Sequence, residues 1–306
     1  MSSRPSGIRV AVLKGGPSSE RDVSLVSGTE CAAALRNEGF GVVEIDAGTD
    51  LSSRLETLEP DIVFNALHGR WGEDGCVQGI LEWMKIPYTH SGVLASSLAM
   101  DKQRAKAVFA AEGLPCAEGR LISVGDLADA HPMNPPYVIK PNNEGSSVGV
   151  FIVRDRAEIP KCLDEITSEV VMVERFVPGR ELTVSVMLDE PLTVTDIRTH
   201  RSWYDYKAKY DPGGSRHIVP ANIPSAVFEA SLDYALRAHR VLGCRGLSRS
   251  DFRWDDRLGV DGLFILETNT QPGMTPTSLS PEQAAACGVE FDTLCRKLVE
   301  DATCGR

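Results

Sequence analysis

Two acidic residues and an asparagine near the end of the chain have the types and spacing of a divalent-metal site. Asp251 belongs to one predicted strand, Glu267 ends the next, and Asn269 follows two residues later, with a turn at 255–259 between the strands. Because side chains alternate along a strand, Glu267 and Asn269 share one face of the sheet. Mg²⁺ prefers such oxygen ligands and completes its octahedron with water and phosphate oxygens. A solvated acidic strand face is the alternative, but the glycine–proline loop that follows favours a metal site.

Three lysines are candidates for binding phosphate groups. Lys140 ends the apolar strand 137–139, Lys102 lies at the start of a predicted helix, and Lys209 lies in the aromatic segment WYDYKAKY. Burying an unpaired ammonium group is costly, so a lysine at the end of a buried strand indicates an anionic neighbour. The loop EGSSVG at 144–149 can present backbone N–H groups to a phosphate, although a plain hairpin is the alternative. The P-loop pattern GxxxxGK[ST] is absent.

Two glycine-containing loops follow predicted strands in the first ninety residues. HGRWGEDG begins at His68, where the preceding strand ends, and α/β sheets place ligands at such strand ends. GGPSSER at 15–21 lacks the dinucleotide pattern GxGxxG. Its Glu20, just before a helix, would repel a pyrophosphate and suits a cation such as an amino acid's ammonium group. A structural role for His68 and a helix-dipole role for Glu20 remain the alternatives.

The elements that must position these residues follow two patterns. Through the first ninety residues strand and helix signals alternate, which predicts a parallel sheet with helices on both faces. The expected strands there are 8–13, 41–46, 61–67 and 86–89, and the expected helices are 23–38 and 74–84. A further helix is expected at 100–112. Beyond residue 113 strands dominate, and they are expected at 137–140, 148–153, 170–174, 181–188, 192–197, 248–254 and 262–267. The helices expected there are 155–166, 224–242 and 281–299, and a long polar stretch covers 198–220.

These patterns predict an α/β protein with a wound parallel α/β domain at its start and a two-part α+β region after it. The expected domains are residues 1–95, 96–178 and 179–306, the last boundary lying where proline and glycine interrupt the strands at 177–179. A length of 306 residues is consistent with two or three domains.

Composition narrows the class of protein. Hydrophobic residues make up 42% and charged residues 25%, as in folded globular proteins. The net charge of −11 argues against a nucleic-acid or anionic-membrane partner. The eight cysteines include no CxxC pair and are expected to be reduced in a cytoplasmic protein. Because no run of 18 apolar residues occurs and Arg9 interrupts the first strand, neither a membrane span nor a signal peptide is expected.

Read in order, five segments resemble the D-alanine–D-alanine ligases of the ATP-grasp superfamily. They are GGPSSERDVSLVSG, HGRWGEDGCVQG, VIKPNNEGSSVGV, WYDYKAKY, and GLSRSDFRWD with LFILETNTQPGMTPTSL, and together they span nearly the whole chain. Ser250, Arg253 and Thr268 depart from the family, which more often has apolar residues there. The resemblance implies an ATP-grasp fold in the α+β region. It also implies ATP-dependent, ADP-forming ligation of two D-alanines through an acylphosphate, for peptidoglycan synthesis.

The resemblance further implies how ATP and metal are bound. ATP would contact Lys102, Lys140, Ser147, Glu174, Phe176, Val177, Glu181 and Lys209. The three lysines would neutralise the phosphates, the segment 174–177 would line the adenine pocket, and Glu181 would bind the ribose. Two Mg²⁺ ions, for which Mn²⁺ could substitute, would be held by Asp251, Glu267 and Asn269.

Substrate and catalytic roles are implied for Glu20, His68, Ser146, Tyr210, Arg249, Gly273, Ser278 and Leu279. Glu20 would hold the first ammonium group and be linked through Ser146 to Tyr210, with His68 nearby. Arg249 and the backbone at Gly273 would stabilise the oxyanion. Ser278 and Leu279 would receive the second carboxylate, and a homodimer is expected.

Three other functions compete with this one. Another ATP-grasp ligase with a different acceptor would differ only in its product. A nucleotide-binding oxidoreductase would be built on the first domain, where the missing GxGxxG counts against it. A non-catalytic ATP-binding regulator is disfavoured because the lysine, aspartate, glutamate and asparagine positions are intact.

Overall fold

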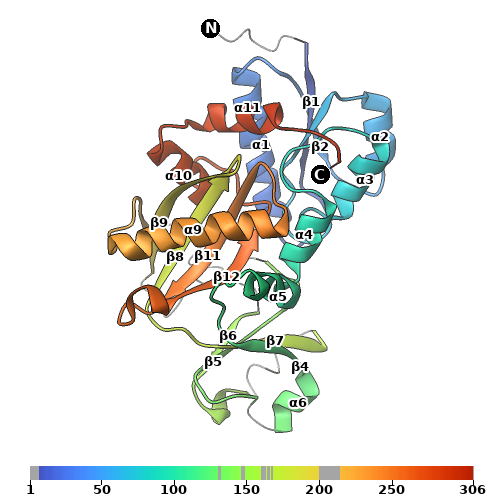
Figure 1. The fold of residues 1–306 in the computed structure, drawn as a ribbon. Helices are drawn as coiled ribbons and strands as arrows, with labels where there is room; N and C mark the ends of the chain where they lie inside the picture. The colour runs from blue at the N-terminus through green and yellow to red at the C-terminus, as the bar shows by residue number, and fades with distance from the viewer. Residues whose placement is uncertain are drawn as a thin grey trace.

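The computed structural model describes residues 7–129, 132–145, 149–159, 163, 166, 168–199 and 214–305. Its strands form three sheets that follow one another down the molecule (Figure 1). The first is parallel and the other two are antiparallel, which confirms the predicted α/β class.

The first sheet places β1 between two parallel neighbours. Its strands, in spatial order, are β2 (Gly41–Asp46), β1 (Arg9–Lys14) and β3 (Ile62–Asn65). Helices α1 (Arg21–Asn37) and α11 (Phe291–Glu300) cover one face, and α2 (Leu51–Leu58) and α3 (Cys76–Met84) cover the other. Val10 and Val12 pack toward the first pair of helices, whereas Ala11 and Leu13 pack toward the second, as the two-residue period of a strand requires. The prediction of helices on both faces is therefore confirmed.

The second sheet has five strands in the described residues. In spatial order they are β10 (Ser215–Ile218), β9 (Glu190–Thr199), β8 (Arg180–Met187), β11 (Leu247–Trp254) and β12 (Leu263–Asn269). One face packs against α4 (Val93–Met100), α5 (Lys102–Ala111) and α9 (Ser225–Leu242), and the other meets α10 (Leu279–Ala286). Along β8, Val184 and Val186 belong to the apolar core with α9, while Ser185 between them bonds to α10.

The third sheet lies at the far end of the molecule from the first (Figure 1). Its order is β4 (Gly119–Ser123), β7 (Val170–Arg175), β5 (Tyr137–Lys140) and β6 (Phe151–Val153), with α6 (Val124–Asp129) beside β4. Tyr137, Ile139 and Val173 are fully buried in its own small core. Single 3-10 turns occur at Arg156–Glu158 and Gly259–Gly262.

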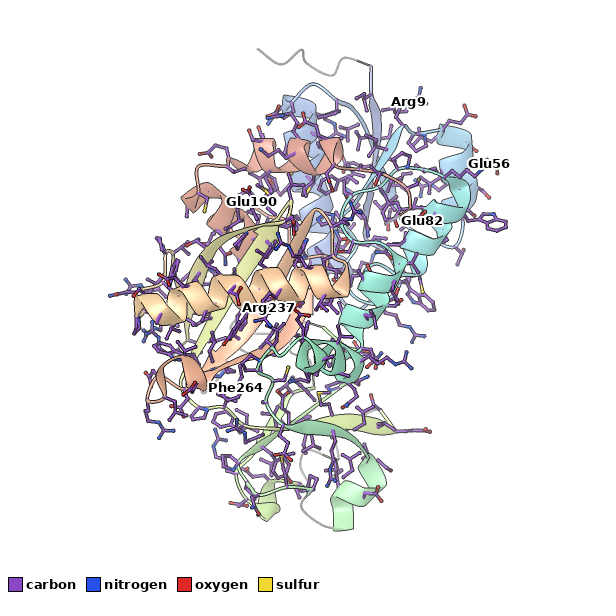
Figure 2. The ribbon with its side chains drawn as sticks, in the orientation of Figure 1. Arg9, Glu56, Glu82, Glu190, Arg237 and Phe264 are labelled. Carbon is purple, nitrogen blue, oxygen red and sulfur yellow. The ribbon has the colours of Figure 1, made fainter. Side chains whose placement is uncertain are left out.

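Side chains join the second and third sheets. Phe264 on β12 (labelled in Figure 2) lies under Arg175 of β7, with the guanidinium carbon 5.0 Å from the ring centroid. Arg237 on α9, also labelled, pairs with Glu112 at the end of α5 and so joins two helices that cover the second sheet. No helix in the described ranges is long and apolar enough to cross a membrane.

Two predicted helices differ from the structure in their bounds. The predicted helix 281–299 divides into α10 and α11, because Gly288 adopts a φ of +81° that ends the first helix. The predicted helix 100–112 begins instead at Lys102, since Asp101 is extended and its side chain accepts a hydrogen bond from the backbone of Arg104. A separate helix, α4, precedes it.

Other differences concern short elements. The predicted strand 86–89 is reduced to single bridges at Tyr88. The strand β10 lies within the polar stretch 198–220, where no strand was predicted, and β4 and α6 also went unpredicted. Part of the predicted helix 155–166 lies outside the described residues.

Candidate active site

A cavity lies where the second and third sheets meet, and most of the predicted nucleotide and metal residues line it. Those residues are Lys102, Lys140, Glu174, Phe176, Val177, Glu181, Asp251 and Glu267. A smaller cavity continues from it and adds Glu73 and Asn269 to the shared Lys102, Gly145 and Glu267. The predicted residues come from α5 and from five strands or their ends, and the packing of the two sheets brings them together.

The predicted metal ligands lie on two paired strands. Asp251 on β11 stands opposite Glu267 on β12 in the register, and Arg249 stands opposite Asn269. The Arg249 guanidinium donates to both oxygens of Asp251, from Nε at 2.8 Å and from Nη2 at 2.7 Å. Thr183 Oγ1 donates to the same carboxylate at 2.6 Å. Asp251 is thus held in place and partly neutralised before any ligand arrives.

The Glu267 carboxylate is also beside a positive charge. The Lys102 ammonium lies 3.1 Å from Glu267 Oε2 and donates to the backbone oxygen of Glu144 at 2.6 Å. Glu267 lines both cavities, Asp251 lines the larger one and Asn269 lines the smaller one. Carboxylate and amide oxygens are the donor set that Mg²⁺ accepts. These residues therefore fit a hard divalent cation, and Lys102 supplies a positive charge at the same carboxylate.

A buried group of three charges forms the wall of the cavity at β5 and β7. Glu174 is 2% exposed and lies 2.7 Å from the Lys106 ammonium, while the Lys140 ammonium contacts its other oxygen. Burial would raise the pKa of the Glu174 carboxyl, but the two lysines outweigh it and hold this pKa below its ordinary value. Burial lowers the pKa of Lys106 despite the Glu174 charge. Both predicted residues, Lys140 and Glu174, are therefore in the cavity.

The residues predicted at the adenine and ribose surround Arg253. Its Nε donates to the Val177 carbonyl at 3.1 Å, and its Nη1 lies 3.6 Å from Glu181. Its guanidinium carbon lies 5.9 Å from the ring centroid of Phe176. The departure from the family at Arg253 thus lies in the lining of the cavity, and not behind it.

The other two residues that differ from the family, Ser250 and Thr268, contact each other. Ser250 and Thr268 are opposite in the β11–β12 register, and their hydroxyl oxygens lie 2.8 Å apart. Both are buried. Each polar group satisfies the other inside the sheet, so the pair is accommodated without water.

The two N-terminal loops lie against each other at the carboxyl ends of β1 and β3. Ser18 Oγ donates to the His68 carbonyl at 2.7 Å, and Glu20 is 8% exposed next to α1. His68 Nδ1 donates to the Gln271 carbonyl at 3.1 Å, so His68 Nε2 accepts from Ser27 Oγ at 3.0 Å. Burial lowers the pKa of His68 to about 4, so the ring is neutral at pH 7. His68 therefore ties the loop before α10 to the first sheet.

The predicted acceptor residues lie where β12 leads into α10. Ser278 immediately precedes α10, and its Oγ accepts from the Thr275 backbone at 3.1 Å. A side chain at Gly273 would begin 3.2 Å from Ser278 Oγ, so glycine allows this close approach. Leu279 opens the helix and packs on Ile197. The structure therefore brings the predicted residues Gly273 and Ser278 close together, with Leu279 next along the chain.

Four predicted site residues, Ser146, Ser147, Lys209 and Tyr210, lie outside the described residues. Sequence reasoning also missed three buried side chains at the site: Lys106, Glu73 and Gln271. Lys106 is four residues after Lys102 and so shares its helix face, a signal that could have identified it. Gln271 bonds to Asn65 across 206 residues, which no local pattern indicates.

Comparisons with known proteins agree with this geometry. The family described as D-ala D-ala ligase N-terminus matches residues 43–91, and the D-ala D-ala ligase C-terminus family matches residues 129–300. The D-alanine–D-alanine ligase of Ruegeria pomeroyi is 64% identical over 306 residues, covering 100% of this chain and 99% of its own. That of Dinoroseobacter shibae is 64% identical over 298 residues, covering 97% and 96%.

Solved structures give the same result. A crystal structure of the Bacillus anthracis D-alanine–D-alanine ligase has a TM-score of 0.83 at 32% identity, and its complex with ATP has 0.81 at 28%. Each covers 96% of this chain and 97% of that chain. The arrangement of three sheets is therefore that of the ATP-grasp ligases. The chain belongs to the D-alanine–D-alanine ligase family.

Proposed function

We propose how this chain carries out the ATP-dependent ligation of two D-alanines to D-alanyl-D-alanine, with ADP and phosphate as products, for peptidoglycan synthesis. The observation that carries the proposal is the pairing of Asp251 with Glu267 in register, at the wall of a cavity that also holds Lys102 and Lys140. Carboxylates for a metal and ammonium groups for phosphates are what phosphoryl transfer from ATP needs.

ATP binds in the cavity between the second and third sheets. Glu174, Phe176 and Val177 contact the adenine, and Glu181 contacts the ribose. Lys102 and Lys140 neutralise the phosphates, together with Ser147 and Lys209 from segments outside the described residues. The buried charges around Glu174 support this arrangement, because two ammonium groups beside one carboxylate leave a net positive charge for the nucleotide.

Asp251, Glu267 and Asn269 hold two Mg²⁺ ions, for which Mn²⁺ could substitute. Such ions, when bound, neutralise charge that develops on the phosphate oxygens. The pairs Arg249–Asp251 and Lys102–Glu267 support the assignment, because the same carboxylates already attract cations. The ion pair with Asp251 then positions the Arg249 guanidinium beside these metal ligands.

Glu20 holds the ammonium group of the first D-alanine and is linked through Ser146 to Tyr210. A carboxylate oxygen of the first D-alanine attacks the γ-phosphorus of ATP, the bond from that phosphorus to the β–γ bridging oxygen breaks, and ADP leaves, so that the carboxylate becomes an acylphosphate. His68 is buried and neutral, so its contribution is to hold the loop at Gln271 and not to supply charge.

The second D-alanine places its carboxylate at Ser278 and Leu279. Its amine attacks the acyl carbon, a C–N bond forms, the C–O bond to phosphate breaks, and the amine loses a proton. Arg249 and the backbone N–H at Gly273 stabilise the oxyanion that develops. The close approach of Ser278 to Gly273 supports this arrangement, since it places the acceptor site next to that N–H group.

Several broader assignments belong to the same proposal. The chain divides into domains 1–95, 96–178 and 179–306, which is supported by the order of the three sheets. It acts in the cytoplasm, which is supported by the buried thiols of Cys31, Cys244 and Cys295. It forms a homodimer, supported by Trp83 and Leu94, which are 89% and 69% exposed on adjacent helices α3 and α4.

The test is ADP release from the purified protein on adding D-alanine, with L-alanine as the control. We expect D-alanine-dependent ADP release and D-alanyl-D-alanine as the product identified by mass spectrometry. ADP release that requires another amine, or that does not depend on D-alanine, would refute the assignment. A coupled assay measures the ADP release, and light scattering on the same sample would test the homodimer.

A further inference from the structure

The smaller cavity carries a buried carboxyl group to which the mechanism above gives no role. Glu73 lies in the loop after β3, lines this cavity and is 6% exposed. Within the described part of the chain, its Oε2 is buried and has no hydrogen-bond partner. A buried carboxyl oxygen without a donor costs free energy, so its presence at a cavity wall indicates that a ligand supplies the donor.

The Glu73 carboxyl converges with that of Glu20. A side-chain atom added at Gly145 would lie 3.0 Å from Glu20 Oε1 and 3.5 Å from Glu73 Oε1, so both oxygens surround one point. Burial raises the pKa of the Glu73 carboxyl well above its ordinary value, and the Glu20 charge raises it further. Two carboxyl groups from separate loops are thus held together at the cost of repulsion.

The nearby cations of the described chain are each paired with another carboxylate, although the Arg249 charge also acts on Glu73 and lowers the pKa of that carboxyl. Lys102 is paired with Glu267, and Arg249 is paired with Asp251. Among the described residues no lysine or arginine forms an ion pair with Glu20 or Glu73. A small ligand with an ammonium group would supply both the missing charge and the missing donors, because such a group carries three N–H bonds in different directions.

We propose that Glu73 is a second acceptor for the ammonium group of the first D-alanine, which is held between the Glu73 and Glu20 carboxyl groups around Gly145. The inference rests on the proposed function, which assigns this ammonium group to Glu20 alone. It makes Glu73 a determinant of specificity, since a substrate with a neutral group in place of the ammonium leaves two acidic groups facing each other.

Glu73→Gln tests the proposal because it keeps the side-chain shape and removes one charge. We expect the KM for the first D-alanine to rise about tenfold or more, since a hydrogen bond to a charged group is lost, with a smaller change in the KM for ATP. Without substrate, the variant should melt at the same or a higher temperature than the wild type, because the repulsion with Glu20 is relieved. The rise in melting temperature on adding D-alanine with AMP-PNP should shrink.

Glu56→Gln on α2 is the matched control, because it removes the same charge from an exposed position labelled in Figure 2. It should leave both KM values unchanged. An unchanged KM for D-alanine in Glu73→Gln, or a lower melting temperature with a normal D-alanine response, would overturn the proposal in favour of a structural role. Failure of the wild type to release ADP with D-alanine would instead overturn the proposed function, so the two failures are distinguishable.

Discussion

At the scale of single residues, the site depends on charges that are buried before any substrate binds. Glu174 has two lysine partners, although only Lys140 was predicted there. Removing a partner from a buried charge is normally costly, but here one lysine and one glutamate would remain as a neutral pair. Lys106 therefore gives the group of Lys106, Lys140 and Glu174 a net positive charge. Because Lys106 shares the Glu174 carboxylate, the ion pair between Lys140 and Glu174 is weaker.

Lys106→Met tests this role. We expect the KM for ATP to rise by about tenfold, because Glu174 then holds Lys140 alone and the site loses a charge that attracts phosphates. Steady-state kinetics and calorimetric titration with ATP measure the effect. Lys297→Met on α11 removes the same charge far from the cavity and serves as the control. Equal ATP affinity in Lys106→Met and the wild type would show that Lys106 only packs against Glu174.

At the scale of elements, Gln283 anchors α10 to the second sheet, beside a hydrogen bond between Ser280 and Ser185. The β8–β9 pairing shifts register between Val184 and Val186, and Gln283 completes the irregularity. Its Oε1 accepts from the Ser185 backbone at 2.7 Å, and its Nε2 donates to Thr183 O at 3.1 Å. Because Ser278 and Leu279 begin the same helix, this contact also positions the proposed acceptor site.

Gln283→Met should therefore affect both stability and acceptor binding. The variant leaves the Ser185 N–H buried without a partner, which costs about 1–3 kcal/mol of unfolding free energy. A shift of α10 should raise the KM for the second D-alanine more than the KM for ATP. Urea denaturation and two-substrate kinetics separate these effects. A variant with wild-type stability would contradict the anchoring role of Gln283.

Sequence patterns predicted long elements well, and they failed where distant contacts decide the outcome. The strand 41–46 matches β2, and the helix 224–242 matches α9 to within one residue, because regular burial creates a regular pattern. The break at Gly288 and the short strand β10 depend on single residues or on pairing with β9. Likewise, strand pattern placed Asp251 and Glu267 on neighbouring strands, but their register depends on an irregularity between Asp251 and Phe252 that the pattern does not show. The meeting of Glu73 with Glu20 requires the packed loops.

At the scale of the whole molecule, the first sheet and the second sheet are joined through buried polar groups. His68 links α1, beside the first sheet, to the loop after β12 of the second sheet. Within the layer of the second sheet, His239 on α9 lies 2.7 Å from Ser248 Oγ on β11. Both rings are at most 4% exposed. Burial lowers the pKa of each to about 4, so each is neutral in the folded protein at neutral pH. Their titration therefore couples the stability of the assembled sheets to pH.

The sign of that coupling follows from proton binding. Between pH 6.5, the ordinary histidine pKa, and about 4, the unfolded chain takes up protons at His68 and His239 that the folded chain does not. Each histidine should then lower the unfolding free energy by about 1.4 kcal/mol for each pH unit across this window. Glu73 acts in the opposite direction, because its raised pKa favours the folded state at low pH. The contribution of each histidine is therefore measured as the difference in unfolding free energy between the wild type and the variant at each pH.

Urea denaturation of the wild type, His68→Gln and His239→Gln at several pH values from 7 to 4.5 measures this contribution. Glutamine keeps a hydrogen-bonding side chain and cannot take up the proton in the unfolded state. We expect each variant to be less stable than the wild type at pH 7, with a difference that narrows steadily as the pH falls below 6.5. Parallel pH profiles for all three proteins would mean that neither ring is held neutral by the fold. In that case, these two histidines would not contribute to the pH dependence of the unfolding free energy.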